Sequence, residues 1–284
     1  MNALFLGGDL RQSYACEYLN KHNISAEYYK DFDLDDKISE KIKEASIVVF
    51  PIPVTKDGKH LNIKSDNLIE LTKLIKLTDK NCILFAGQFP EIIKEYLLAH
   101  NHIFVDFTDI ESFQIQNALL SAEGAIYYAK QRLDKCIHGS EIAILGFGRI
   151  GKILAYLLHS QGAKITVCAR KDSDFTWSKL IGFNGFKIKI SGNRSNLDLI
   201  NNKYDLIFNT IPFWIMDENF AKNKNSDTVI IDLASRPFGI DESLVSKYNL
   251  KYYRELAIPG RYAPQSAGEI IGKAIINYIS VKED

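Results

Sequence analysis

Three glycines at a fixed spacing are the clearest chemical signal in this sequence of 284 residues. They lie in Leu145-Gly146-Phe147-Gly148-Arg149-Ile150-Gly151, after the apolar run 141–145 and before an apolar pattern of helical period. In dinucleotide-binding turns the first glycine permits the turn, the second lets a pyrophosphate approach, and the third brings helix and strand together. The free N–H groups of such a helix bind phosphate. The motif therefore predicts a nicotinamide-dependent oxidoreductase, and the alternative is a glycine-rich turn without a ligand.

The end of the next expected strand, 164–169, indicates which nucleotide binds. NAD-selective sites carry an acidic residue about 20 positions after the glycine motif, whereas a 2′-phosphate favours arginine. Here the strand is followed by Arg170-Lys171-Asp172-Ser173. Arg170 can form two hydrogen bonds to a phosphate, and Lys171 and Ser173 can add charge or a hydroxyl. We predict NADP rather than NAD, and the alternative is that Arg170 and Lys171 lie on a solvated turn.

Two further strand ends are expected near the cofactor. The strand 206–209 leads into Asn209-Thr210-Ile211-Pro212, and the strand 228–233 leads into Ala234-Ser235-Arg236-Pro237. Ligands of open α/β sheets bind beyond the carboxyl ends of the strands. We therefore expect Asn209, Thr210, Ile211, Pro212, Ala234 and Ser235 to contact the cofactor. For both segments the alternative is an ordinary loop start marked by proline.

Short apolar runs alternate with amphipathic stretches along the whole chain, a pattern typical of parallel sheets with crossover helices. It predicts an α/β protein with two Rossmann-like or flavodoxin-like parallel-sheet domains separated by a cleft. We expect an N-terminal substrate-side domain over 1–130 and a Rossmann domain over 131–265. A long helix over 112–133 would link them, and a C-terminal helix over 266–281 would pack back on the first domain.

Composition excludes several classes of function. The chain has 35 basic and 35 acidic residues, so it lacks the broad positive field that nucleic-acid or anionic-membrane binding requires. No apolar run reaches the roughly 18 residues of a membrane helix. The four cysteines and the histidines show no zinc-ligand spacing, so no metal site is expected. We expect a cytoplasmic protein.

Several motifs together resemble the A-subunit family of dipicolinate synthase. They are Gly7-Gly8-Asp9-Leu10-Arg11-Gln12, Ser121-Ala122-Glu123-Gly124, Ile137-His138-Gly139-Ser140, the glycine motif, the Asp232–Pro237 turn and Pro259-Gly260-Arg261-Tyr262-Ala263-Pro264. The resemblance implies oxidation of a dihydrodipicolinate-type intermediate of the lysine pathway to pyridine-2,6-dicarboxylate, with a nicotinamide cofactor. It also implies sporulation, the mother cell as location, and a flavoprotein-like partner, the dipicolinate synthase B-subunit.

A small dicarboxylate substrate needs two anion sites, and forked guanidinium groups suit them. Arg11, Arg236 and Arg261 are the candidates because each lies in a turn after an apolar strand or beside a proline. Arg11 could instead be solvated at a tight corner, and Arg261 could anchor the last helix. Glu123 and His138 are the candidate catalytic bases. A loop histidine is more often structural, and Glu123 could pair with a cation or cap a helix.

Two other functions remain open at this point. A non-catalytic cofactor-binding subunit of the same complex would keep the glycine motif and need no base. A two-domain hydroxy-acid or shikimate-like dehydrogenase would normally show a histidine with an acidic partner, or a Lys–Asp pair. The oligomeric state is open, and a homo-oligomer agrees with the sequence.

Overall fold

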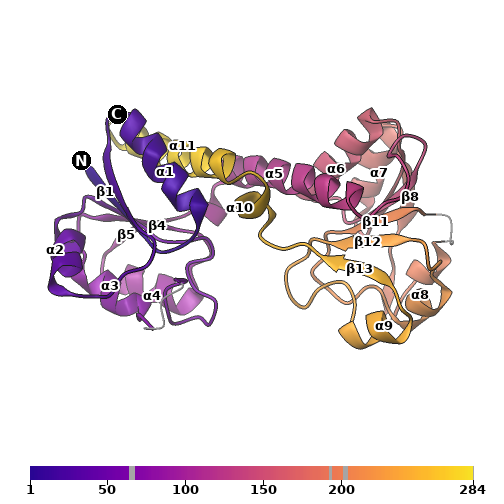
Figure 1. Ribbon diagram of the computed structural model, residues 1–284, viewed down its shortest axis with the longest axis horizontal. Coiled ribbons are helices and arrows are strands. Elements are labelled where there is room, and N and C mark those ends of the chain that lie inside the picture. The colour runs from indigo at the N-terminus through magenta and orange to yellow at the C-terminus, as the bar shows by residue number, and fades with distance from the viewer. Residues whose placement is uncertain (64–67, 192–193, 201–203, 284) are drawn as a thin grey trace. The chain divides into compact units, whose positions relative to one another are not determined.

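The computed structural model describes residues 1–63, 68–191, 194–200 and 204–283. The chain divides into two compact units, which are described separately (Figure 1). Unit 1 comprises Met1–Asn117 and Pro259–Asp284, and unit 2 comprises Ala118–Ile258. Each unit contains one parallel sheet, of five strands in unit 1 and six in unit 2. The expected α/β fold with two parallel sheets is therefore confirmed.

Unit 1 has the strand order β2-β1-β3-β4-β5, which is the flavodoxin-like order. Its strands are β1 (Asn2–Leu6), β2 (Ser25–Tyr29), β3 (Ile47–Val49), β4 (Ile83–Ala86) and β5 (Ile103–Asp106). Its first helices are α1 (Leu10–Lys21), α2 (Asp36–Glu44), α3 (Leu71–Leu77) and α4 (Glu91–Ala99). The central strands β3 and β4 are almost wholly buried, as parallel strands covered on both faces must be.

The C-terminal helix α11 (Pro264–Glu283) packs along α1 within unit 1 (Figure 1). Two glycines allow this close approach. A Cβ atom at Gly268 would meet the backbone oxygen of Arg11 at 2.6 Å, and one at Gly272 would meet the ring of Tyr18 at 2.4 Å. The short helix α10 (Ile258–Tyr262) precedes α11. The C-terminal helix thus returns to the first sheet unit, as the apolar period 266–281 predicts.

Unit 2 has the strand order β13-β12-β11-β6-β7-β8, which is the nucleotide-binding Rossmann order when numbered from β6. Its strands in this sheet are β6 (Glu141–Leu145), β7 (Lys164–Ala169), β8 (Asn184–Lys187), β11 (Leu206–Asn209), β12 (Val229–Asp232) and β13 (Lys251–Arg254). Its helices include α6 (Arg149–Ser160), α7 (Asp172–Leu180), α8 (Glu218–Asn223) and α9 (Glu242–Lys247). Two short strands, β9 (Ile190–Ser191) and β10 (Arg194–Ser195), pair antiparallel.

The alternation of side chains along the strands builds the core of unit 2. Ala143 and Leu145 of β6 face a cluster that includes Phe220 of α8, and Leu244 of α9 packs against that cluster. Figure 1 shows α6 and α7 on the other face of this sheet. The carboxyl ends of β6, β7, β11, β12 and β13 are therefore left at one edge, where ligands of such sheets bind.

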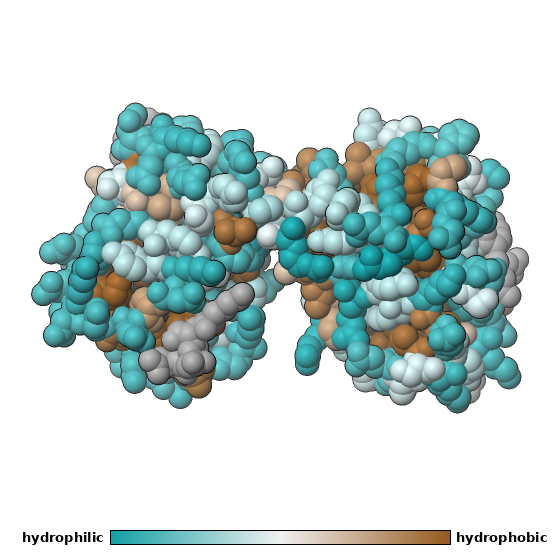
Figure 2. Space-filling view, viewed as in Figure 1, coloured by the Kyte–Doolittle hydropathy of each residue, from teal (hydrophilic) through white to brown (hydrophobic). Residues whose placement is uncertain are grey.

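Some predicted boundaries shift in the structure. The long helix α5 spans Glu111–Lys130, three residues short of the expected end at 133. The short apolar run over 186–190 predicts a strand there, and the structure has β8 two residues earlier, at Asn184–Lys187. The division into compact units falls inside α5, so the domain limits at 130 and 265 stay a prediction. Figure 2 shows a mainly hydrophilic face with small hydrophobic patches. Among the described helices, none is long and apolar enough to span a membrane.

Candidate nucleotide-binding site

The turn between β6 and α6 uses its three glycines in three different ways. Gly146 has φ +98°, and a Cβ atom there would lie 2.3 Å from the hydroxyl of Thr210. A Cβ atom at Gly151 would lie 2.2 Å from the backbone oxygen of Gly146, so this glycine brings α6 against the turn. At Gly148 nothing lies within 4 Å. The first and third glycines therefore serve the fold, and the second leaves open space above the backbone.

The start of α6 is suited to bind an anion. Gly148 is the N-cap residue and supplies no side chain to cap the helix, so the first N–H groups of this 12-residue helix keep their capacity to bind a phosphate. Arg149 is exposed, Ile150 is half-buried and Phe147 is buried. The backbone N–H and the hydroxyl of Thr210 both donate to the Leu145 oxygen at 2.9 Å. These bonds join the loop after β11 to the end of β6.

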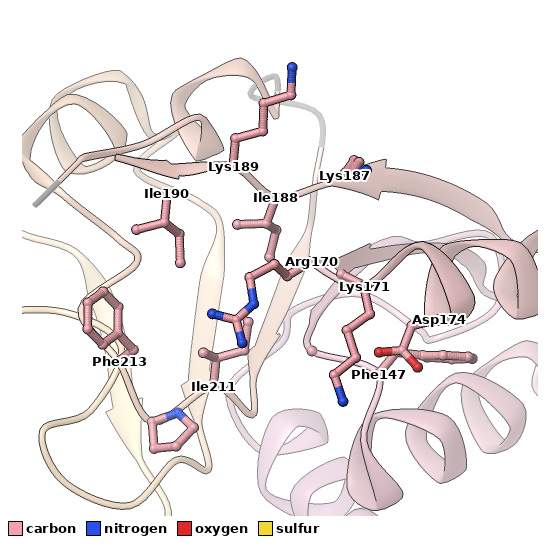
Figure 3. A pocket seen from close by; sticks show the side chains of 13 residues that line it. Phe147, Arg170, Lys171, Asp174, Lys187, Ile188, Lys189, Ile190, Ile211 and Phe213 are labelled. Carbon is pink, nitrogen blue, oxygen red and sulfur yellow. The ribbon is translucent and has the colours of Figure 1, made fainter. Parts of the chain in front are cut away.

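A pocket of about 790 Å³ lies beside this turn (Figure 3). It is lined by Gly146, Phe147, Ala169, Arg170, Lys171, Asp174, Lys187, Ile188, Lys189, Ile190, Ile211, Pro212 and Phe213. The volume suits a nucleotide, and the walls combine apolar side chains with a few charged groups, as ligand pockets do. The structure thus brings Gly146, Phe147, Arg170, Lys171, Ile211 and Pro212 together, all of which the sequence singles out.

Arg170 is the cation that is best directed into the pocket. Figure 3 shows its guanidinium group pointing into the space between Ile188 and Ile211, whereas the ammonium group of Lys189 points away. Lys187 forms an ion pair with Asp172 at the start of α7. Lys187 and Lys189 are lining residues that were not expected from the sequence, although the alternation of lysine and isoleucine over 187–190 is a strand-like signal.

Asn209 and Asp232 form a buried polar network beneath the loops that follow β11 and β12. Both side chains are 0% exposed, and Asn209 Nδ2 donates to Asp232 Oδ1 at 2.9 Å. Asp232 Oδ2 accepts hydrogen bonds from the Gly239 N–H at 2.8 Å and from the Tyr252 hydroxyl at 2.6 Å. Burial, and then the bond to Asp232, raise the pKa of Tyr252. Asn209 therefore holds the loops in place, and its side chain is not exposed to a ligand.

The other residues expected near the cofactor lie at the rim or below the surface. Ser173 is exposed at the start of α7, and Ser235 is exposed after β12. Ala234 is buried, and its N–H donates to Asp232 Oδ1 at 2.9 Å. None of these three lines the pocket. Arg236 is exposed, with its guanidinium carbon 5.9 Å from the centroid of the Phe238 ring.

The two remaining substrate candidates belong to unit 1. The Arg11 side chain is only 13% exposed, and it donates to both carboxylate oxygens of Asp9 at 2.9 Å and 2.8 Å and to the Ile52 oxygen at 2.7 Å. Gly260 packs directly on this pair. Arg11 is thus largely engaged within the fold, which is a different environment from the open anion site that we expected. Arg261 is exposed in α10.

Neither candidate base lines the pocket. Glu123 is exposed on α5. His138 precedes β6 and packs over Gly162, where a Cβ atom would meet its ring at 2.3 Å. The pocket lies beyond the carboxyl end of β6, and His138 lies at the amino end, so a five-residue strand separates them. The structure therefore gives His138 a packing role and does not bring it to this site.

The described residues contain no group of three or more His, Cys, Asp and Glu side chains that could hold a metal ion. Three of the cysteines, Cys16, Cys82 and Cys168, are buried, and burial is the main cause that raises their pKa values to about 11, 12 and 12. Cys136 is exposed. Nucleotide binding, through the glycine turn, the helix start and the pocket, is the chemistry for which this arrangement is suited.

Comparison with protein families divides the chain in the same way. Residues 2–108 match the model of the N-terminal domain of the dipicolinate synthase A-subunit. Residues 141–236 match the model named NADP oxidoreductase coenzyme F420-dependent. Unit 2 therefore contains an oxidoreductase-like dinucleotide-binding domain.

Relatives cover nearly the full length. The chain is 27% identical to the dipicolinate synthase A-subunit of Bacillus subtilis (strain 168), over 95% of this chain and 93% of that protein. The crystal structure of the dipicolinate synthase A-subunit from Bacillus halodurans has a TM-score of 0.82 and 25% identity, over 98% of this chain and 97% of that one. D-lactate dehydrogenase from Escherichia coli, at 12% identity and a TM-score of 0.67 over 100% and 97% of the two chains, shares the fold.

Proposed function

This chain is a homologue of the dipicolinate synthase A-subunit, and we propose that it oxidises a dihydropyridine dicarboxylate with NADP⁺ as the hydride acceptor. The substrate would be a dihydrodipicolinate-type intermediate, and the product pyridine-2,6-dicarboxylate. The ring would lose one hydride to the cofactor and one proton to a base or to water. Hydride transfer is the chemistry that the nicotinamide supplies, and the protein binds and orients the reactants.

The observation that carries the proposal is the open space above the backbone at Gly148. This glycine has φ −78°, which any residue can adopt, and nothing lies within 4 Å of the position of a Cβ atom. No steric or conformational need of the fold therefore explains a glycine here. A pyrophosphate that approaches the backbone at the start of α6 does explain it.

Arg170 supports the choice of NADP over NAD. It follows β7 and lines the pocket together with Lys171, where the ribose of a bound dinucleotide is expected. A guanidinium group can form two charge-assisted hydrogen bonds to the 2′-phosphate. NAD has a hydroxyl in place of that phosphate and would leave the guanidinium without its anion. Ile188 and Ile211, on either side of Arg170, provide apolar surface for the adenosine part of the ligand.

Titration of the purified chain with NADPH and NADH, followed by nucleotide fluorescence, tests this assignment. For Arg170→Met we expect NADPH binding to weaken roughly 10- to 100-fold, because charge-assisted contacts contribute about 1.5–3 kcal/mol. NADH binding should stay unchanged. Lys164→Met is the matched control, because Lys164 lies at the other end of the same strand and is 65% exposed. A chain that prefers NADH, or an equal loss in both variants, would refute the NADP assignment.

Gly148→Ala tests whether the pyrophosphate occupies the open space at Gly148. We expect stability in urea to change by less than about 0.5 kcal/mol, as for other substitutions that meet no neighbour. Binding of both nucleotides should nevertheless be weakened strongly, because the methyl group occupies the space that the pyrophosphate needs. Unchanged binding of both nucleotides would mean that the phosphates do not lie at Gly148.

Arg236 is the substrate contact that we propose in unit 2, because it is exposed beyond the carboxyl end of β12. We further propose that turnover requires the flavoprotein-like B-subunit of dipicolinate synthase. Neither Glu123 nor His138 lines the pocket, which favours a chain that depends on its partner for turnover. The chain could then be a catalyst that needs the partner, or a cofactor-binding subunit that is not itself catalytic. An assay of NADP⁺ reduction by the dihydrodipicolinate-type substrate, with the purified chain alone and with this flavoprotein-like partner, distinguishes the two cases. NADPH formation without the partner would identify this chain as the catalyst.

A further inference from the structure

The guanidinium groups of two arginines in unit 2 lie near the same aromatic ring. The guanidinium carbons of Arg236 and Arg254 lie 5.9 Å and 4.3 Å from the centroid of the Phe238 ring. Because both distances are measured to the same centroid, the two carbons cannot be farther apart than the sum of these distances. A guanidinium group that contacts an aromatic ring can still donate hydrogen bonds to a carboxylate from its N–H edge.

Strand pairing explains why these residues meet. Arg254 ends β13, and its partner in the parallel register is Asp232, which ends β12. Arg236 and Phe238 follow Asp232 in the loop after β12. Arg254 therefore lies at the carboxyl end of β13 and Arg236 beyond that of the neighbouring β12, at the edge of the sheet where ligands of this fold bind.

The loop that carries Phe238 is held in a fixed shape. Asp232 accepts hydrogen bonds from the N–H groups of Ala234 and Gly239, on either side of Arg236, at 2.9 Å and 2.8 Å. Trp214 Nε1 donates to the Pro237 oxygen at 2.9 Å. Phe238 itself has φ +72°, in the left-handed region that a bulky side chain rarely adopts. Strained backbone that its surroundings hold in place is common at ligand sites.

The acidic groups near the pair leave room for a ligand carboxylate. Glu242 forms an ion pair with Arg254, and its side chain is 76% exposed, against 28% for Arg254. Asp232 is fully buried and engaged with the loop and with Tyr252. Asp241 caps α9 by accepting a hydrogen bond from the Ser243 N–H at 2.8 Å. An exposed pair such as Arg254–Glu242 contributes little stability, so another carboxylate can replace Glu242.

We propose that Arg254 and Arg236 bind the two carboxylates of one planar ring dicarboxylate, while Phe238 holds the two guanidinium groups in place. One ligand carboxylate then takes the position of the Glu242 carboxylate on Arg254. The inference rests on the proposed function, and it adds Arg254, which supplies the second carboxylate contact. Arg11 is not needed for this contact, because its guanidinium group is engaged by Asp9.

Isothermal titration calorimetry of the full-length chain with saturating NADP⁺ tests the inference. The probes are pyridine-2,6-dicarboxylate and pyridine-2-carboxylate, which has one carboxylate fewer. For Arg254→Met we expect the Kd of the dicarboxylate to rise roughly 10- to 100-fold, the effect of losing one charge-assisted contact. The Kd values of the monocarboxylate and of NADP⁺ should not change. Glu242→Gln is the control, and it should bind the dicarboxylate as tightly as the unmodified chain or more tightly.

Several results would overturn the inference. These are equal losses for both probes in Arg254→Met, a loss that extends to NADP⁺, or a dicarboxylate Kd that the variant leaves unchanged. If the unmodified chain binds NADP⁺ and no dicarboxylate, the arginine pair is refuted and the NADP assignment stands. If it binds no NADP⁺, the proposed function fails, and the same titrations without cofactor test the arginine pair alone.

Discussion

Lys224 carries a charged ammonium group that is buried without a hydrogen bond in the described part of the chain. Its Nζ atom is buried and has no hydrogen-bond partner among the described residues. The rings of Tyr204 and Phe220 lie 5.7 Å and 5.5 Å from it. Burial lowers the pKa of Lys224 from 10.5 to about 8. We therefore expect that Lys224→Met, which keeps the length of the side chain and removes the charge, stabilises unit 2 at neutral pH.

The magnitude follows from this pKa. Each unit of pKa corresponds to about 1.4 kcal/mol, so a shift from 10.5 to about 8 makes the charged lysine cost about 3 kcal/mol below pH 8. Attraction between the ammonium group and the two rings offsets about 1–2 kcal/mol of this. The expected gain for Lys224→Met at pH 7 is therefore about 1–2 kcal/mol. Above pH 8 the folded unmodified chain loses the proton and the unfolded chain keeps it, so unmodified stability rises and the gain shrinks toward pH 10.5.

Urea unfolding at pH 7 and pH 10, followed by tryptophan fluorescence, measures this gain. The two tryptophans of the chain, Trp177 and Trp214, both lie in unit 2, so their emission reports on the unit that carries Lys224. Lys222→Met is the control, because Lys222 is exposed on α8 and two residues away. The reasoning is refuted if Lys224→Met is less stable at pH 7, if its gain is the same at both pH values, or if the control shows an equal gain.

Two further predictions concern the glycine turn and the thiols. Gly151→Ala should destabilise the chain by about 1–3 kcal/mol in urea and weaken NADPH binding, because its Cβ atom would lie 2.2 Å from a backbone oxygen; unchanged stability would contradict the close packing of α6 on the turn. At pH 8 a thiol reagent should label one cysteine per native chain quickly, Cys136, because the other three are buried with raised pKa values. Cys136→Ser should abolish that fast phase, and any fast phase that remains would argue against the burial of the other thiols.

The parts of the site that local sequence determines could be predicted. The glycine motif, the strand Lys164–Ala169 and the strand Leu206–Asn209 have the expected positions, because turn chemistry and apolar alternation act over a few residues. β8 is displaced from 186–190 to Asn184–Lys187 because α7 packs against its start. A Cβ atom at Gly185 would meet the ring of Phe175 at 2.5 Å. Strand propensity reflects each residue separately, so it does not predict this contact between a helix and the strand that follows it.

Contacts between distant segments could not be predicted. Arg254 and Phe238 are brought together by the parallel register of β12 and β13, and nothing in either segment alone indicates it. Arg11 satisfies the residue type and position expected of an anion site, yet Asp9 engages two of its nitrogens. Whether a neighbouring carboxylate pairs with an arginine or faces solvent depends on the path of the backbone, here the corner at Gly7 and Gly8.

Each unit has a glycine turn between its first strand and the helix that follows, and the first turn of that helix differs between the two units. In unit 1, Asp9 caps α1 by accepting a hydrogen bond from the Arg11 N–H, and its carboxylate occupies the position where a phosphate would bind. A Cβ atom at Gly8 would meet the Gln12 side chain at 2.7 Å, so the backbone there is covered. In unit 2, Gly148 provides no cap and leaves the backbone open. A dinucleotide at α1 would have to displace this charged cap, so we expect a nucleotide to bind to unit 2 and not to unit 1.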